Sequence, residues 1–439
     1  MITNESLMTS RRTEILAGIS TFLATMYIIV VNPAILSQSG LPFSGVVTAT
    51  VLLSFFCSLM MGFYARNPIV VAPGMGMNAF FTFTAVKGMG IKPEVALGAV
   101  FWAGVLFLIM SILNVRSAIV RIIPPPIRYA VSAGIGLFIT LIGFENARFI
   151  IANPATLVSI AHFNDPIILT FVFGLLLTSA LVVRDVPGAI IIGIVLTTIA
   201  AWPIGRFWGD ASAINFGQKT LVNIQGIWSA PDFSLLGKLD LMGSLSWSLW
   251  PVIFAFAFTD LFDSLSTFVG VAEAGGLQDA NGQPQHLNQS MLTDAVATTL
   301  AGVFGTSPGT AYIESAVGIA QGGRTGLTAI VAGCCFLPFL FLSPLLSVIP
   351  SIATAPALVL VGAFMMKPII RIDWGKLDDA LPAFLALVLI PFSYSITQGL
   401  IWGFLSWTII KIAVGKRNEV PLGLLIVDVF CVLALSAGH

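Results

Sequence analysis

The sequence contains very little charge for its length. Only 9% of its 439 residues are Asp, Glu, Lys or Arg, whereas soluble domains carry about 25%. The 20 basic and 20 acidic residues cancel to a formal net charge of zero, which gives no indication of a nucleic-acid partner. The mean hydropathy of +0.98 leaves no room for a large soluble domain. These shortages predict a multi-pass, all-α integral membrane protein.

Cysteine and histidine are scarce as well. The 4 cysteines lie in apolar stretches without paired spacing, and none of the 3 histidines lies in such a stretch. A disulfide framework, a metal site and a histidine proton relay are therefore not expected. The motifs HExxH, GxSxG, GxxxxGK[ST] and GxGD do not occur, so we expect neither an enzyme nor a cofactor. An ion channel would need symmetric rings of ligands rather than one cluster of acids.

Apolar stretches predict fourteen membrane segments, in two halves of seven. They lie at 14–31, 45–64, 69–86, 95–114, 127–145, 167–183, 187–204, 245–271, 288–304, 309–321, 326–348, 354–369, 380–396 and 398–414. Most Lys and Arg residues then fall on the side of the N-terminus, which predicts a cytoplasmic N-terminus in the cell (plasma or inner) membrane. A further run at 421–437 is either a fifteenth span or a helix packed alongside.

The third and tenth segments are both interrupted by proline and glycine. They read NPIVVAPGMGMNAFFTFTAV and GTSPGTAYIESAVGIAQ, and the helix breaks fall at Pro73, Gly74, Pro308 and Gly309. A polar residue follows each break, Asn78 in the third segment and Glu314 in the tenth. Seven segments per half would invert one half relative to the other. Inverted repeats with matching broken segments point to a transporter's central site, whereas a single break would indicate only a kink.

Carboxylates inside membrane segments are costly and therefore indicate function. In the eighth segment Asp260, Asp263, Ser264 and Thr267 follow helical spacing, so we expect them to line one polar cavity. Interhelical hydrogen bonding is the alternative for Ser264 and Thr267. Two acids one turn apart predict that one of them holds a proton near neutral pH, which suits a proton-coupled carrier. We expect Glu314 to accept hydrogen bonds from N–H groups of a substrate.

Two further polar residues lie near segment ends. Asn32 closes the first segment, the repeat partner of the eighth, and is either a cavity ligand or a helix cap. We interpret Asp294 as a carboxylate at the start of a helix, without a role in the site.

Four stretches resemble the AzgA-like purine permeases, a nucleobase–cation symporter branch related to the uracil and xanthine permeases. They are VVNPAIL, APGMGMNAFF, FTDLFDSLSTFVGVAEAGGL and GTSPGTAYIESAVGIAQGGRTGLTAI. The resemblance extends from about residue 10 to residue 437. It implies two inverted seven-span repeats, with short strands in segments 3 and 10 that cross at the substrate site. It also implies a homodimer and a division into a core domain (14–115 and 245–348), a gate domain (116–205 and 349–414), an extracytoplasmic loop (206–244) and a C-terminal hydrophobic segment (415–439).

The resemblance also implies which residues hold the purine. It places Asp260 and Glu314 on the base, with Asn78, Gly76 and Thr310 beside it. Uracil-permease relatives carry a histidine where this chain has Ser264, so proton coupling is assigned here to Asp260, Asp263 and Glu314. Asn32, Ser264 and Thr267 would support the site. Phe80 and Phe262 either stack on the flat base or pack within the protein.

The resemblance implies proton-coupled uptake of purine nucleobases, with a core that moves against a gate. The NPAIL and APGMGMNAFF stretches resemble hypoxanthine and guanine carriers more than adenine-selective ones. A carboxylate accepts from the N1–H of an oxopurine, whereas adenine has an unprotonated N1 and suits a protonated acid. The alternatives are an adenine-selective or broad purine symporter and, after these, an anion transporter of the same architecture.

Overall fold

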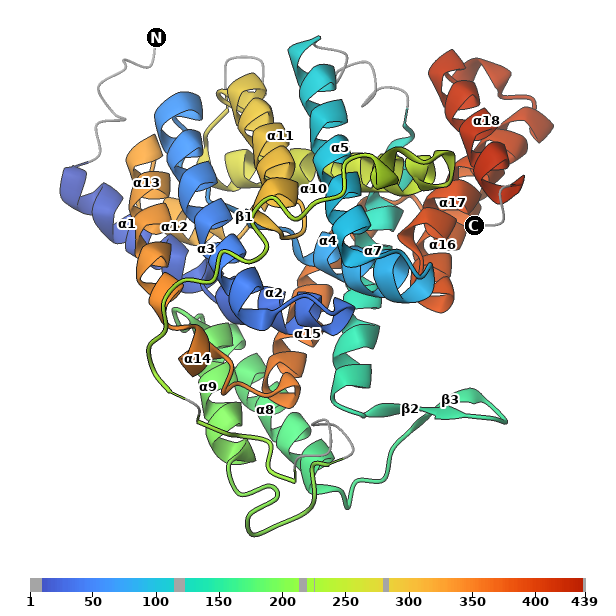
Figure 1. Ribbon diagram of the computed structural model, residues 1–439. Helices are drawn as coiled ribbons and strands as arrows, with labels where there is room; N and C mark the ends of the chain where they lie inside the picture. Colours follow the sequence, from blue (N-terminus) through green and yellow to red (C-terminus); the bar gives the residue numbers. More distant parts are fainter. Residues whose placement is uncertain (1–9, 114–122, 213–218, 225, 279–283, 437–439) are drawn as a thin grey trace.

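The computed structural model describes residues 10–113, 123–212, 219–224, 226–278 and 284–436 (Figure 1). Every predicted membrane segment coincides with a helix or with a short strand followed by a helix. Among the described residues, 8 helical stretches are long and apolar enough to cross a membrane. The predicted boundary between residues 115 and 116 lies outside the described residues. The all-α fold class is confirmed.

The first half of the chain is mostly helical. Its elements are α1 (Arg11–Thr25), α2 (Ile28–Leu36), η2 (Ser37–Ser39), α3 (Phe43–Met60), η3 (Met61–Ala65), β1 (Val71–Pro73), α4 (Met75–Ala79), η4 (Phe80–Gly88), α5 (Pro93–Ile112), α7 (Pro125–Asn146), β2 (Ile150–Asn153), β3 (Leu157–Ile160), α8 (Pro166–Val183) and α9 (Ala189–Ala201).

The described residues of the second half also form mostly helices, with the short strand β4 among them. Its elements are η5 (Gly243–Leu245), η6 (Trp247–Leu249), α10 (Trp250–Gly275), α11 (Leu287–Phe304), β4 (Gly309–Ala311), α12 (Ser315–Ala320), α13 (Gly326–Phe336), η7 (Leu337–Phe341), α14 (Ser343–Leu346), α15 (Ser351–Met365), η8 (Lys367–Arg371), α16 (Leu377–Ser393), α17 (Ile396–Ala413), η9 (Arg417–Glu419) and α18 (Leu422–Ser436).

The first predicted segment is two helices rather than one. Helix α1 ends at Thr25 and α2 begins at Ile28, so Met26 and Tyr27 lie at a break. The hydroxyl of Thr25 donates to the carbonyl of Thr21 at 2.9 Å, and such back-bonding bends helices. The break places the Tyr27 side chain in the interior, where 2% of its surface is exposed.

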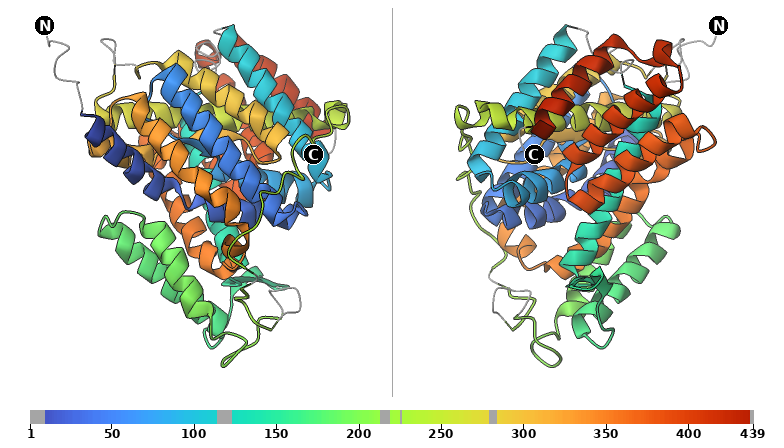
Figure 2. Two further views of the ribbon diagram at one scale, coloured as in Figure 1. Left: turned by 60° about the vertical axis from the view of Figure 1, so that its left-hand side comes forward. Right: turned by 90° about the vertical axis from the view of Figure 1, so that its right-hand side faces the viewer.

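The helices pack in two groups. In the first helix group, defined as α1–α5 with α10–α13, α1 and α3 pack on α13, and α5 packs on α11. In the second helix group, defined as α7–α9 with α15–α17, α7 packs on α15 and α16, and α16 packs on α17. Helices α8 and α9, green in the figures, lie at one edge of the molecule (Figure 2). Contacts between the groups join α4 to α7, α10 to α17 and α2 to α15.

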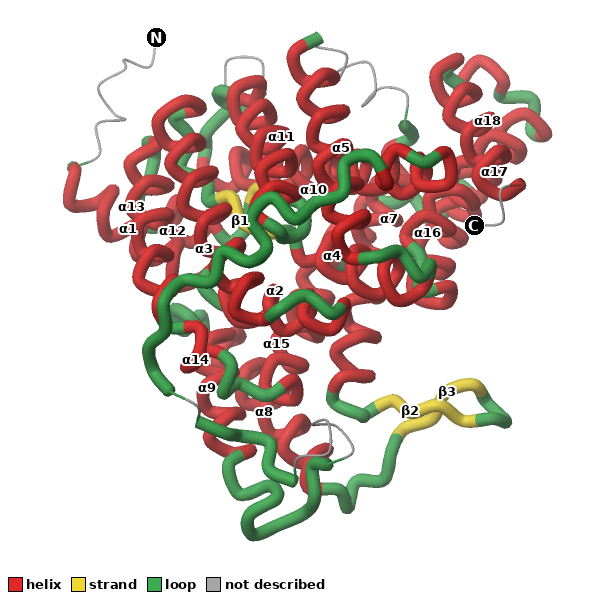
Figure 3. Tube along the Cα trace, in the orientation of Figure 1, coloured by secondary structure: helices red, strands yellow, loops and turns green. Residues whose placement is uncertain are grey.

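Strands β1 and β4 cross in the middle of the first helix group (Figure 3). They pair antiparallel, with Ala72 opposite Thr310, and the N–H of Gly74 donates to the carbonyl of Pro308 at 2.8 Å. Both strands are fully buried. Because each strand supplies partners for the other, extended backbone is tolerated inside a membrane protein. The predicted strands of segments 3 and 10 are therefore confirmed.

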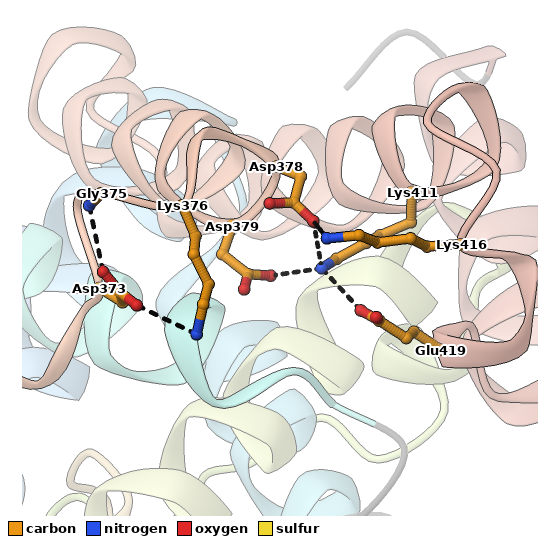
Figure 4. Close-up of polar contacts among 8 residues, drawn as sticks. All are labelled: Asp373, Gly375, Lys376, Asp378, Asp379, Lys411, Lys416 and Glu419. Atoms are coloured by element: carbon orange, nitrogen blue, oxygen red, sulfur yellow. Dashed lines mark hydrogen bonds and ion pairs between the residues drawn. The ribbon is translucent and has the colours of Figure 1, made fainter.

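A buried ion-pair network joins α16 to the end of α17 (Figure 4). The ammonium of Lys411 contacts Asp378 at 2.7 Å, Asp379 at 3.1 Å and Glu419 at 2.8 Å, and its side chain is only 3% exposed. Lys416 adds a second contact to Asp378 at 2.6 Å. Helix α18, which covers most of the run at 421–437, follows this network and packs on α17.

Candidate binding site

The helix breaks lie where the two strands cross. Pro73 ends β1 and Gly74 caps α4, while Pro308 directly precedes β4, which begins at Gly309. A Cβ at position 74 would lie 2.8 Å from Cγ2 of Thr310, which is closer than real Cβ atoms approach other atoms. Glycine at position 74 is therefore what allows the two broken segments to approach each other.

Glu314 lies three residues beyond the end of β4, at the residue that precedes α12. Its Oε1 accepts a hydrogen bond from the hydroxyl of Tyr27 at 2.7 Å. Tyr312 lies beside this pair, with its ring centroid 6.5 Å from that of Tyr27, and its hydroxyl donates to the carbonyl of Pro73 at 2.5 Å. Sequence reasoning missed Tyr27. A lone hydroxyl in the apolar stretch MYIIVVNP was the one available signal.

Asp260 is fully buried between α10, α11 and β4. The hydroxyl of Thr298 on α11 donates to the Asp260 carboxylate and also lies 3.0 Å from the carbonyl of Gly309. One turn further along α10, the hydroxyl of Ser264 lies 2.7 Å from that of Thr310. Asp260 and Ser264 therefore fasten α10 to the broken tenth segment, and Thr310 contributes through this contact.

Asp294 belongs to the same buried region, and its interpretation as a helix-start carboxylate is wrong. Helix α11 begins at Leu287, about two turns earlier, and Asp294 is fully buried. Its carboxylate interacts with Ser264 of α10 and with the backbone N–H of Ala311 in β4. Asp294 is close enough to Asp260 to interact with it electrostatically. The sequence pattern suggested that Asp294 lies near the start of a helix, and this assumption hid its place in the buried region.

Asp263 faces a cavity between α10 and the second helix group. Phe262 and Thr259 line the same cavity from α10, while Ser132 and Ile135 line it from α7. The expected single polar face of α10 is therefore divided between two environments. At about 100° per residue, Asp263 lies about 60° from Asp260 and about 100° from Ser264 around the axis of α10, so it can reach the cavity while the other two face β4. Asp263 remains close enough to Glu314 to interact electrostatically.

The third segment contributes Asn78 and Gly76. The amide oxygen of Asn78 accepts from the hydroxyl of Ser307, which links α4 to the residues before β4. A Cβ at Gly76 would lie 2.6 Å from Cγ2 of Ile135 on α7, so Gly76 lies at the contact between the two helix groups. Phe80 is fully buried against Phe256, with ring centroids 4.6 Å apart, and is not among the residues that line the cavity.

Asn32 and Thr267 are both buried. The amide nitrogen of Asn32 donates to Thr50 at 2.7 Å and to Thr306 at 2.9 Å. Asn32 thus connects α2, α3 and the tenth segment. Among the residues that the structure describes, no group of three or more His, Cys, Asp or Glu has an arrangement that could hold a metal ion.

Comparisons with known proteins identify relatives that are permeases. A family model described as "Permease family" matches residues 12–401. The chain is 39% identical over 429 residues to the adenine permease AdeP of Escherichia coli (strain K12), which covers 97% of this chain and 93% of that protein. It is also 39% identical over 431 residues to the guanine/hypoxanthine permease PbuO of Bacillus subtilis (strain 168), with coverage of 97% and 96%.

The similarity to solved structures concerns the fold. The transmembrane domain of a cyanobacterium bicarbonate transporter, BicA, superimposes with a TM-score of 0.65 at 17% sequence identity. The match covers 89% of this chain and 97% of that domain. The overall fold of this chain is therefore similar to that of a domain with low sequence similarity.

Proposed function

Because the chain belongs to the permease family, we propose that it carries purine nucleobases across the cell membrane together with protons. The observation that carries this proposal is the carboxylate of Glu314, which lies three residues beyond the strand crossing and accepts a hydrogen bond from a tyrosine. A half-buried carboxylate at that position provides an acceptor for the N–H groups of a flat heterocycle. Its second oxygen, Oε2, is the one that we assign to the base.

Hypoxanthine and guanine are the substrates that we propose first. The identity of 39% to both an adenine permease and a guanine/hypoxanthine permease does not separate these purines. The chemistry of the site supports the oxopurines, because N1–H needs an acceptor and Glu314 supplies one. An adenine-selective or broad purine symporter is the second candidate. An anion transporter fits less well, since an anion site would be expected to offer a cation or bare helix N-termini, whereas this region holds Asp260, Asp263 and Glu314.

We propose that the first helix group acts as the core and the second as the gate. The cavity between α10 and α7 would then open and close as the core moves against the gate, which is alternating access. Asp260 would carry the proton or contact the base, with Asp263 and Asp294 tuning that step. The orientation with a cytoplasmic N-terminus, the plasma or inner membrane and a homodimer complete this proposal.

Uptake into cells that lack their own purine carriers tests the function. We expect saturable accumulation of radiolabelled hypoxanthine that unlabelled guanine inhibits more strongly than adenine, xanthine or uracil does. A protonophore should abolish accumulation above the external concentration. Accumulation that a protonophore leaves unchanged would contradict proton coupling, and absence of uptake of any purine would contradict the proposed function.

A further inference from the structure

The break between α1 and α2 holds a tyrosine against the proposed substrate carboxylate. The hydroxyl of Tyr27 donates to Oε1 of Glu314 across 287 positions of sequence. We infer that Tyr27 is a positioning residue that sets the purine preference of the site, because it keeps Glu314 an acceptor toward the base. This inference rests on the proposed function and assigns the residue that discriminates between oxopurines and adenine.

The position of the Tyr27 hydroxyl is fixed from several sides. The carbonyl of Tyr27 accepts from the N–H groups of Val30 and Val31, at 3.1 and 3.0 Å, which anchors its backbone to the start of α2. Its ring packs beside that of Tyr312, and the Tyr312 hydroxyl is itself bound to the carbonyl of Pro73. With 2% of Tyr27 exposed, its side chain has little freedom to turn away from Glu314.

The direction of the hydrogen bond determines what Glu314 offers to a ligand. A tyrosine hydroxyl has one proton to donate, and an ionised carboxylate has only acceptor sites. While Tyr27 donates to Oε1, the ionised form of Glu314 gains a charge-assisted hydrogen bond. An oxopurine presents N1–H to such an acceptor, and guanine adds a 2-amino group. Adenine presents an unprotonated N1, which would leave two acceptors facing each other.

The second helix group contains a matched pair for comparison. There the hydroxyl of Tyr394 donates to Oε2 of Glu145, also at 2.7 Å, but on an exposed part of the molecule. The Tyr394→Phe variant removes the same kind of hydrogen bond without touching the strand crossing. It therefore controls for the general effect of deleting a tyrosine hydroxyl.

Equilibrium binding of hypoxanthine and of adenine to the purified full-length protein tests the inference. We expect the wild-type protein to bind hypoxanthine more tightly, and Tyr27→Phe to reduce that preference about tenfold, chiefly by weakening hypoxanthine. Tyr394→Phe should leave the ratio of the two Kd values unchanged. In a Glu314→Gln background, Tyr27→Phe should produce no further change in the ratio.

Several results would overturn the inference. If Tyr27→Phe leaves the ratio of the two Kd values unchanged, or abolishes binding of both purines, Tyr27 has a merely structural role. If Tyr27→Phe does not fold, Tyr27→His should keep the hypoxanthine preference, since it retains a ring N–H donor, and loss of the preference would refute the role. A wild-type protein that prefers adenine overturns this inference alone. A wild-type protein that binds no purine overturns the proposed function instead.

Discussion

Two tyrosine–glutamate hydrogen bonds of the same length lie in different surroundings. Tyr27 and Glu314 meet at 2.7 Å beside the strand crossing, and Tyr394 and Glu145 meet at 2.7 Å on an exposed part of the second helix group. The bond length is therefore no guide to importance. Water can replace the partner of an exposed carboxylate, whereas a half-buried carboxylate depends more on the partners that the fold supplies. The surroundings are what make Glu314 a candidate for substrate binding.

The largest expected effect comes from neutralising the two glutamates in turn. Glu314→Gln should lower purine uptake on the order of 100-fold, because a hydrogen bond to a charged group is worth about 1.5–3 kcal/mol and the amide also donates toward the base. Glu145→Gln should keep uptake within about twofold of wild type. Initial rates of radiolabelled hypoxanthine uptake, normalised to protein in the membrane, measure both. Equal losses in the two variants would remove the distinction between the pairs.

Neutralising Asp260 is expected to affect coupling. Asp260→Asn should abolish accumulation driven by an imposed pH gradient, because its carboxylate is buried beside Asp294 and accepts a hydrogen bond from the neutral Thr298 hydroxyl. Accumulation in vesicles with an acidic exterior measures this effect.

Asp232 provides the control for a carboxylate bonded to a hydroxyl outside the core. The hydrogen bond from Ser44, at 2.6 Å, lowers the pKa of Asp232 below its ordinary value, so this group stays charged at neutral pH. Asp232→Asn should therefore leave accumulation driven by the pH gradient unchanged. Normal pH-driven accumulation by Asp260→Asn would refute the coupling role.

The ion-pair network of the second helix group should affect stability rather than transport chemistry. Lys411→Met removes the cation that Asp378, Asp379 and Glu419 share, although Lys416 still contacts Asp378. Because Glu419 is 52% exposed, the loss should be smaller than the about 3–5 kcal/mol expected for a fully buried pair. The midpoint of thermal unfolding in detergent should fall accordingly.

The smallest effect on stability is expected from the exposed ion pair in the loop before α16. Lys376 contacts Asp373 at 3.1 Å, and this neighbour raises the pKa of Lys376 while lowering that of Asp373. Lys376→Met should nevertheless shift the unfolding midpoint little, since exposed pairs contribute little. A larger shift for Lys376→Met than for Lys411→Met would contradict the assignment of the buried network.

Much of this architecture could be predicted from local patterns. Long apolar stretches predict the helices. The Pro-Gly pairs at 73–74 and 308–309 indicate the broken segments, where β1 and β4 are found. Both features depend on residues close in sequence, since a helix needs a continuous apolar run and a break needs residues that cannot continue the helix.

The partners of the polar residues could not be predicted in the same way. Tyr27 and Glu314, or Asn78 and Ser307, meet only because the two halves of the chain fold against each other. Asp294 was misread because α11 begins well before it. Helical spacing alone grouped Asp263 with Asp260, whereas packing decides which part of α10 faces β4 and which faces the cavity.

Equilibrium binding is the most direct test of the central claim, since it does not depend on coupling or on movement between states. Radiolabelled hypoxanthine should bind saturably to the purified wild-type protein and to Glu145→Gln with similar Kd values. Glu314→Gln should bind at least tenfold more weakly while keeping the same unfolding midpoint. Binding of hypoxanthine to a folded Glu314→Gln variant with the wild-type Kd would contradict the claim that Glu314 holds the base.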